Sequence, residues 1–261
     1  MAVSLKIGLT VFLTMKKDPR YDIEMMQKNK LKLSDSFAFD CSACGKCCRN
    51  REDILLSPHD MFRAAKHLNL QPKQFFEKYC ETYIGHMSKC PAVRLKPKSI
   101  YNNLLLREPQ IQGTVCPLLS SNGQCSIHLS KPTSCAIFPL GKFHSEGDKT
   151  VSYYLQSDIP CGDKSKRQSL KEWLTKFDIF HTEEMMIVWT SFLNFAVKVL
   201  KEIDTFAQKT KDLTYTLYLN ILYFNYNFEE KFLPQLKANI ATFEKLMKPL
   251  ELMKSQVEDT E

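Results

Sequence analysis

The stretch CSACGKCC, residues 41–48, places four cysteines within eight positions, and the last two are adjacent. Core packing gives no reason to crowd thiols so closely, whereas thiolates are strong metal ligands. Two residues separate Cys41 from Cys44 and Cys44 from Cys47, so a tight turn can bring their sulfur atoms to one metal. Gly45 relieves that turn where the chain must fold back. The run therefore predicts a metal site.

Two kinds of metal site fit this run. Three thiolates with this spacing can hold three corners of a [4Fe–4S] cluster, while a C-x2-C pair supplies half of a tetrahedral zinc site. Adjacent residues in an extended segment point to opposite sides, so either Cys47 and Cys48 bridge two metals or one of them is not a ligand. The three-cysteine run suits a cube better than a single ion. This favours iron–sulfur, and zinc is the alternative.

Four more cysteines lie downstream, in a region rich in proline and glycine that reads as loops and short strands. With the first run they make two groups of four in sequence order. This allows two four-thiolate centres, or one centre with four structural or redox thiols, and the sequence does not say which distal cysteine completes which site. A disulfide framework is the rival interpretation, and it is rare in the cytoplasm. The candidate metal ligands are Cys41, Cys44, Cys47, Cys48, Cys116, Cys125, Cys135 and Cys161.

The two remaining cysteines and one histidine give weaker signals. Cys80 lies on an apolar helical face, which predicts a buried, inert thiol. Cys90 lies in a predicted turn, where a peripheral metal ligand is an alternative role. His128 follows Cys125 by three residues and is a further candidate ligand. No sequence motif identifies a nucleophile or a general base, so the sequence leaves open whether the protein is an enzyme.

Composition and charge limit the other functions. The chain has 261 residues, of which 44% are hydrophobic and 25% charged, as in a folded globular protein. Its net charge of +7 is concentrated in residues 1–165, which hold 23 Lys and Arg against 15 Asp and Glu and all ten cysteines. Metal-bound thiolates would balance this charge, and the basic residues are scattered, which argues against nucleic acid. No stretch is long and apolar enough for a membrane span, so we expect a cytoplasmic protein.

The pattern of the chain predicts an α+β fold. Residues 1–35 are interpreted as an N-terminal extension in which Met15 is the true start; the intact mass of the native protein tests this. Residues 36–165 are a cysteine-cluster metal-binding domain with short strands and helices. It packs on a helical region at residues 166–261.

Local signals place several elements. Ser57, Pro58 and Asp60 form a helix start, and a second short helix follows from Pro72. Short strands are predicted at residues 37–40, 103–108, 136–144 and 151–156, with a hairpin between the last two. Apolar residues at helical spacing predict helices over residues 185–203 and 232–250, the latter with Asn227 and Glu230 as a capping pair. Residues 212–227 suit a helix by the spacing of their apolar residues and a strand by their aromatic content; a helix is favoured.

Three segments together resemble a known family. They are CSACGKCC, then DILLSPHDMFRAAKHLNLQPKQFFEKY, then CPLL…GQCSIHLSKPTSCAIFPL. From about Phe39 to Cys161 they are similar to the bacterial YkgJ-type cysteine-cluster family, a zinc- or iron-chelating domain. That family commonly has Tyr, Arg-Pro and Cys-Arg in its downstream motif, where this chain has His128, Lys131 and Ala136. The resemblance implies metal or iron–sulfur binding and puts a role for family arginines in doubt.

A more distant similarity suggests an activity. The flagellin lysine N-methylase has a similar cysteine cluster, which implies methylation of a protein lysine with S-adenosylmethionine bound at an open iron. Two hypotheses follow. The first is an iron–sulfur protein that acts as an oxidoreductase or as a cluster-dependent methylase with a protein substrate. The second is a zinc-stabilised binding module without catalytic activity that recognises a protein partner.

Overall fold

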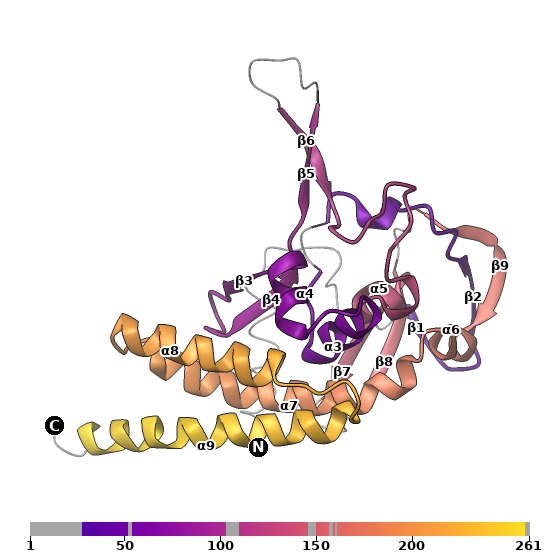
Figure 1. Cartoon of the computed structure of the whole chain (residues 1–261). Helices are drawn as coiled ribbons and strands as arrows, with labels where there is room; N and C mark the ends of the chain where they lie inside the picture. Colours follow the sequence, from indigo (N-terminus) through magenta and orange to yellow (C-terminus); the bar gives the residue numbers. More distant parts are fainter. Residues whose placement is uncertain are drawn as a thin grey trace.

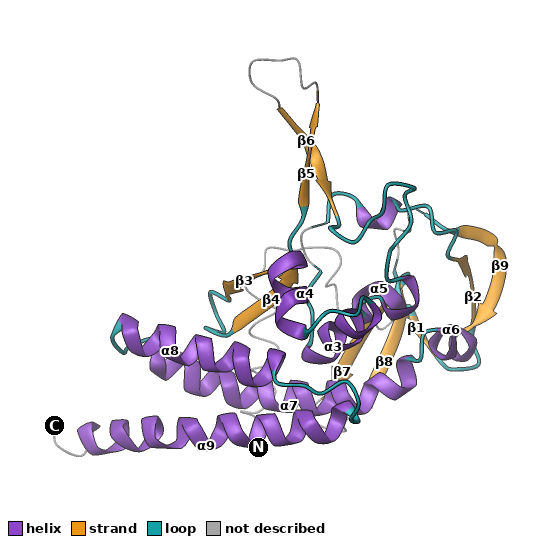
Figure 2. Cartoon of the chain, in the orientation of Figure 1, coloured by secondary structure: helices purple, strands orange, loops and turns teal. Residues whose placement is uncertain are grey.

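A computed structural model describes residues 28–51, 54–102, 110–145, 150–156, 159 and 161–258. The predicted α+β fold is confirmed: strands form small sheets around the cysteine-rich part, and long helices make up the C-terminal part (Figure 1). Figure 2 shows the long helices in one layer, with the strands and short helices on one side of it. Most of the predicted extension, residues 1–27, lies outside the described residues.

The strands pair in four small antiparallel sheets. The order β1–β8–β7 makes a three-stranded sheet, and β2–β9, β3–β4 and β5–β6 are two-stranded. The β5–β6 ribbon projects away from the rest of the molecule (Figure 1). The strands are β1 (Lys30–Leu31), β2 (Ser36–Asp40), β3 (Cys80–Ile84), β4 (Pro91–Leu95), β5 (Lys98–Asn102), β6 (Gln110–Val115), β7 (Leu140–Ser145), β8 (Thr150–Leu155) and β9 (Asp163–Ser169).

The predicted start of the first helix is confirmed. Helix α3 (Pro58–His67) begins after Ser57, whose hydroxyl accepts from the Asp60 N–H while the Asp60 carboxylate accepts from the Ser57 N–H. This reciprocal pairing satisfies two backbone donors that the first turn leaves unpaired. The predicted second helix follows as α4 (Pro72–Tyr79).

Asp60 also connects α3 to a distant segment. Its buried carboxylate accepts hydrogen bonds of 2.8 Å from the Thr133 N–H and 2.7 Å from the Thr133 hydroxyl. Thr133 is the first residue of helix α5 (Thr133–Ile137), so residues 136–137 of the predicted strand are helical and that part of the prediction is wrong. The strand begins at Leu140 as β7 and pairs with β8, as predicted for the hairpin. Residues 146–149, between the two strands, are not among the described residues.

Asp60→Ala is expected to lower the free energy of unfolding by about 2 kcal/mol, because it leaves the buried donors of Thr133 and the half-buried donors of Ser57 without a partner. Urea unfolding followed by circular dichroism measures this. Glu172→Ala is the matched control, since Glu172 makes the same kind of capping box with Ser169 on the exposed start of α6. The control is expected to cost about 1 kcal/mol or less. Equal losses for the two variants would contradict the role of Asp60 between α3 and α5.

The C-terminal helices follow the predicted apolar stripes. They are α6 (Leu170–Lys176), α7 (Ile179–Ile203), α8 (Gln208–Leu219), a π-helical turn η4 (Asn220–Phe224) and α9 (Phe232–Glu258). The predicted capping pair is misplaced, because α9 begins at Phe232. The Asn227 amide instead donates to the Glu230 carboxylate in the turn before the helix, where Gln235 bonds the Asn227 backbone in both directions.

Two hydrophobic cores form beside each other. The first joins α3, α4, β3 and β4 to α7, α8, η4 and α9. The second joins β2, α5, β7 and β8 to α6 and the start of α7, around the fully buried Trp173. Residues on both sides of position 165 thus share a core, and the division of the chain at 165 stays a prediction. Across the described ranges, no helix has the length and apolar character to cross a membrane.

The strand prediction for residues 37–40 is confirmed by β2, and that for residues 151–156 by β8. The helix favoured for residues 212–227 is confirmed in α8 and η4 up to Phe224. The strand predicted at residues 103–108 falls outside the described residues.

Candidate metal centre

All eight candidate ligand cysteines line one cavity, which has a volume of about 70 Å³. A single water molecule needs only about 10–15 Å³ on the same measure. Phe39 and Phe138 form part of the wall on the side of the second core, and Leu95 and Ile127 on the side of the first. The cavity therefore lies at the junction of the two cores. All ten cysteines have free thiols.

The other two cysteines lie elsewhere. Cys80 and Cys90 are each 6% exposed, pack in the first core and do not line the cavity. Cys80 is buried as predicted, although it begins β3 and is not on a helix. Burial raises the pKa of both thiols, that of Cys90 to about 12, so both are protonated at neutral pH. The sequence prediction thus separates the eight cysteines at the cavity from the two in the core.

The first cysteine run is a series of tight turns. Ala43 and Gly45 have positive φ angles of 51° and 67°, and a Cβ at Gly45 would lie 2.5 Å from the Gly123 carbonyl oxygen. Cys47 and Cys48 belong to a 3-10 turn, η2 (Lys46–Cys48), and their thiols are hydrogen-bonded. The expectation that these two side chains point to opposite sides of an extended segment is therefore wrong.

Strand pairing brings the last candidate cysteine to the first run. In the β2–β9 ladder Asp40 is opposite Asp163, which places Cys161 beside the residues that follow β2. The Cys161 thiol is hydrogen-bonded to that of Cys44, and its charged form is repelled by Cys47, Cys44 and Cys41. Burial and this crowding raise the pKa of Cys161 to about 11.

A second pairing brings Cys116 to Cys48. Arg49 and Val115 form an antiparallel bridge, and the Cys116 N–H donates to the Cys48 carbonyl oxygen at 2.8 Å. The thiols of these two cysteines are hydrogen-bonded. That bond and burial raise the pKa of Cys48 to about 12, and the same bond lowers the pKa of Cys116.

Cys125 and Cys135 complete the wall. An antiparallel bridge between Leu119 and Cys125 places Cys125 beside the loop that follows Cys116. Cys135 lies in α5. Burial raises the pKa of both thiols, that of Cys135 to about 12. The charged form of Cys116 is repelled by both of them.

Positive side chains face these thiols. Lys131 is 8% exposed, lies with its Nζ 4.0 Å from the centre of the Phe177 ring, and favours the charged forms of Cys47, Cys125 and Cys135. Arg51 also lines the cavity and favours the charged form of Cys135. The sequence analysis did not identify the roles of Lys131 and Arg51. The feature that could have indicated them is Lys131, a positive residue at a position where the similar family has Arg.

His128 is also at the cavity, in the 3-10 turn η3 (His128–Ser130). Its ring centroid lies 5.9 Å from that of Phe177. Burial and the charge of Lys131 lower the pKa of this imidazole, which keeps it neutral at pH 7. A neutral imidazole is the form that binds metals.

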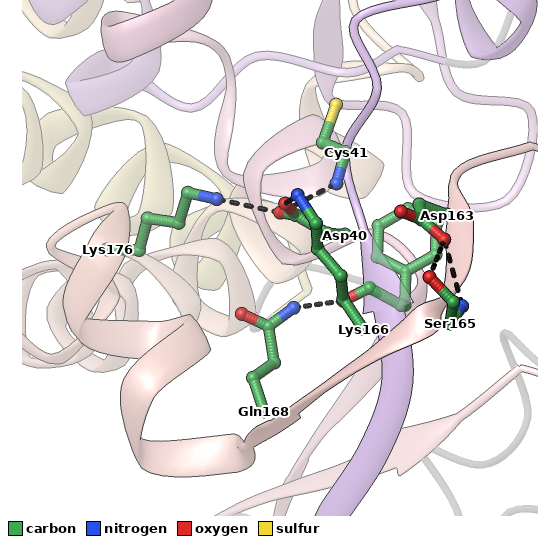
Figure 3. A network of polar contacts seen from close by, with 8 residues as sticks. Asp40, Cys41, Asp163, Ser165, Lys166, Gln168 and Lys176 are labelled. Atoms are coloured by element: carbon green, nitrogen blue, oxygen red, sulfur yellow. Dashed lines mark hydrogen bonds and ion pairs between the residues drawn. The ribbon is translucent and has the colours of Figure 1, made fainter.

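A polar network fixes the entry to the first run (Figure 3). Asp40 accepts from the Lys176 ammonium at 2.9 Å and the Lys166 ammonium at 3.2 Å, and it also accepts from the Cys41 N–H at 3.0 Å. The two lysines lower the pKa of Asp40. Gln168 donates to the Phe39 carbonyl beside this network. These contacts hold the backbone of Cys41 against β9 and α6.

The cavity fits a positively charged metal group. Its metal-binding donors are eight thiols and the His128 imidazole, and no carboxylate is among its lining residues. Eight thiolates in this space would repel one another, and a metal removes that repulsion by binding them. Within the described part of the chain, no three Cys, His, Asp or Glu side chains are already arranged as ligands of one ion. A metal bound here would have to draw the thiolates together.

Lys131→Met is expected to weaken metal binding about tenfold, because it removes the buried positive charge that offsets three thiolates. Competition with a coloured chelator measures the affinity. Lys73→Met, on the exposed surface of α4, is the control and is expected to change nothing. An unchanged affinity for Lys131→Met would exclude this role.

The comparison with family models agrees with this geometry. Residues 40–162 match the CxxCxxCC family, described as "Putative zinc- or iron-chelating domain". This part of the chain is similar to that family. The matched segment begins one residue before Cys41 and ends one residue after Cys161, so it contains all eight cysteines at the cavity. No curated protein and no solved structure matches the chain.

Proposed function

We propose that the CxxCxxCC domain binds metal through the eight cysteines at the cavity, in the form of an iron–sulfur centre. The observation that carries the proposal is the separation of the cysteines: eight line one cavity and two are buried in the core away from it. Chance placement of thiols in a core would not divide them in this way.

The chemistry of the donors supports zinc or iron over hard cations. Thiolates bind zinc and iron–sulfur clusters, whereas calcium and magnesium need oxygen ligands. Eight thiols are more than the four that one zinc ion takes. The turns that present Cys41, Cys44 and Cys47 from one short segment suit the corners of an iron–sulfur cube.

The parts of the chain have separate roles toward such a centre. The cysteines supply thiolate ligands, and Lys131 and Arg51 offset their negative charge. Phe39 and Phe138 exclude water from one side of the cavity. A bound iron–sulfur cluster would supply electron transfer. An oxidoreductase role, or methylation of a protein lysine with S-adenosylmethionine, stays a prediction from the resemblance.

Metal and sulfide analysis of protein purified without oxygen tests the proposal, together with the optical spectrum before and after dithionite. Iron and acid-labile sulfide in near-equal amounts, with a broad absorption near about 400 nm that bleaches on reduction, are the expected result. Zinc without sulfide or colour would replace the iron–sulfur proposal by a zinc-stabilised binding module. Protein without either metal would contradict both.

A further inference from the structure

We propose that the eight cysteines form two separate four-thiolate centres. The centres differ from the two groups in sequence order, because Cys161 joins the first group of cysteines and Cys48 joins the second. The outer centre is Cys41, Cys44, Cys47 and Cys161; the inner centre is Cys48, Cys116, Cys125 and Cys135. This inference rests on the proposed metal binding and adds which cysteine belongs to which centre.

Backbone pairing determines the outer set. The β2–β9 ladder, with Asp40 opposite Asp163, brings Cys161 beside the turn that holds Cys41 and Cys44. The thiols of Cys44 and Cys161 are hydrogen-bonded, and the thiols whose charges act on Cys161 are Cys47, Cys44 and Cys41. These are the three members of the C-x2-C-x2-C run, so Cys161 supplies their fourth partner.

A different backbone pairing determines the inner set. The bridge between Arg49 and Val115 and the bond from the Cys116 N–H to the Cys48 carbonyl place these two cysteines side by side. Cys48 contacts Cys116 through its thiol and is close to Cys125. Cys116 is in turn close to both Cys125 and Cys135.

Packing agrees with this division for the four cysteines that contact a hydrophobic core. Cys116, Cys125 and Cys135 pack against the first hydrophobic core, whereas Cys41 packs against the second. Cys125 is also close to Cys47 and Cys41, and Cys135 to Cys47 as well as Cys48; the core that Cys125 and Cys135 share with Cys116 assigns both to the inner set. Adjacent Cys47 and Cys48 then mark the boundary between the two centres.

The two centres differ in access to solvent. Cys44 is exposed, and Cys44 and Cys161 also line an open hollow on the surface with Ser42, Lys46 and Lys164. The inner thiols lie against the core, as in closed structural metal sites. The outer centre is therefore the one that exchanges metal or electrons with the surroundings.

Cysteine alkylation of the native, metal-loaded protein, read residue by residue by mass spectrometry, tests the assignment. Lys46 separates the tryptic peptide of Cys41 and Cys44 from that of Cys47 and Cys48. In Cys161→Ser, Cys41 and Cys44 are expected to become reactive, Cys116, Cys125 and Cys135 to stay protected, and the bound metal to fall by about half. Cys48→Ser is expected to do the reverse. Cys80→Ala, which removes a thiol outside the cavity, is expected to change neither set.

Exposure of Cys116, Cys125 and Cys135 in Cys161→Ser would overturn the exchange and favour grouping in sequence order. Exposure of all eight in either variant would contradict separate centres. Cys80 and Cys90 report folding in the same experiment, since they stay unreactive while the first core is intact. Should Cys161→Ser unfold, Cys44→Ser tests the exchange through Cys161, which is expected to become reactive; a Cys161 that stays protected would favour grouping in sequence order. Wild-type protein whose eight cysteines all react and which holds no metal would instead contradict the proposed function itself.

Discussion

Removal of the metal by a chelator, without oxygen and with reductant present, is expected to lower the melting temperature by about 10–20 °C. The thiols line a cavity between two hydrophobic cores, so the metal holds together segments that otherwise rest on small two-stranded sheets. Each hydrophobic core persists in the metal-free protein, so only part of the metal-binding free energy adds to the free energy of unfolding. A loss of about 5 kcal/mol in a chain of this size corresponds to the shift given.

Differential scanning calorimetry before and after chelation measures this effect, and reloading with the metal originally found must restore the transition. Cys41→Ser/Cys48→Ser is the control: it lacks one ligand of each predicted centre, so it is expected to melt low and to respond little to the chelator. A melting temperature that the chelator leaves unchanged in the wild type would show that the cavity does not hold a structural metal.

Gly162→Ala is expected to lower the free energy of unfolding by about 3 kcal/mol. Gly162 has a φ of 88°, and a Cβ there would overlap the ring of Phe39. That ring is 1% exposed and packs edge-on against Trp173 at 5.5 Å and Phe138 at 5.7 Å, so it cannot move aside. The substitution therefore adds a steric clash to the strain of a left-handed backbone, directly beside Cys161.

Gly123→Ala separates the two contributions. Gly123 has a similar φ of 81°, but a Cβ there would meet no atom within 4 Å. Only the backbone strain remains, and the expected loss is about 1 kcal/mol. Urea unfolding of both variants in the metal-free state isolates the packing effect, and metal analysis then shows whether Gly162→Ala also loses metal. Similar losses of stability for the two variants would mean that Phe39 does not constrain the backbone at Cys161.

Local patterns predicted the elements that depend on local interactions. The capping residues of α3 and the apolar stripes of α7 and α9 act within a few residues, and these helices form where they were expected. Helix α5 was missed because it begins at Thr133, where the bonds to Asp60 connect residues 73 positions apart. Such a contact leaves no periodicity in the sequence.

The candidate site shows the same limit. Cysteine spacing singled out the thiols that line the cavity, since the two-residue repeats and the turn-rich segment are local features; that they bind metal stays a prediction. Which thiols from distant parts of the sequence lie together depends on two backbone pairings. Asp40 with Asp163 brings Cys161 to the first run, and Arg49 with Val115 brings Cys116 to Cys48. The sequence marked Lys131 only as the residue at a position where the similar family has Arg, and the fold shows that its charge acts on the thiols.

X-ray absorption at the edge of the metal found in the native protein is the most direct test of thiolate binding at this cavity. The account predicts a first shell made of sulfur at about 2.3 Å, the distance of a metal–thiolate bond, with a second shell of iron neighbours if the centre is iron–sulfur. A first shell of nitrogen and oxygen without sulfur would contradict it, because the metal would then be bound somewhere other than the eight cysteines.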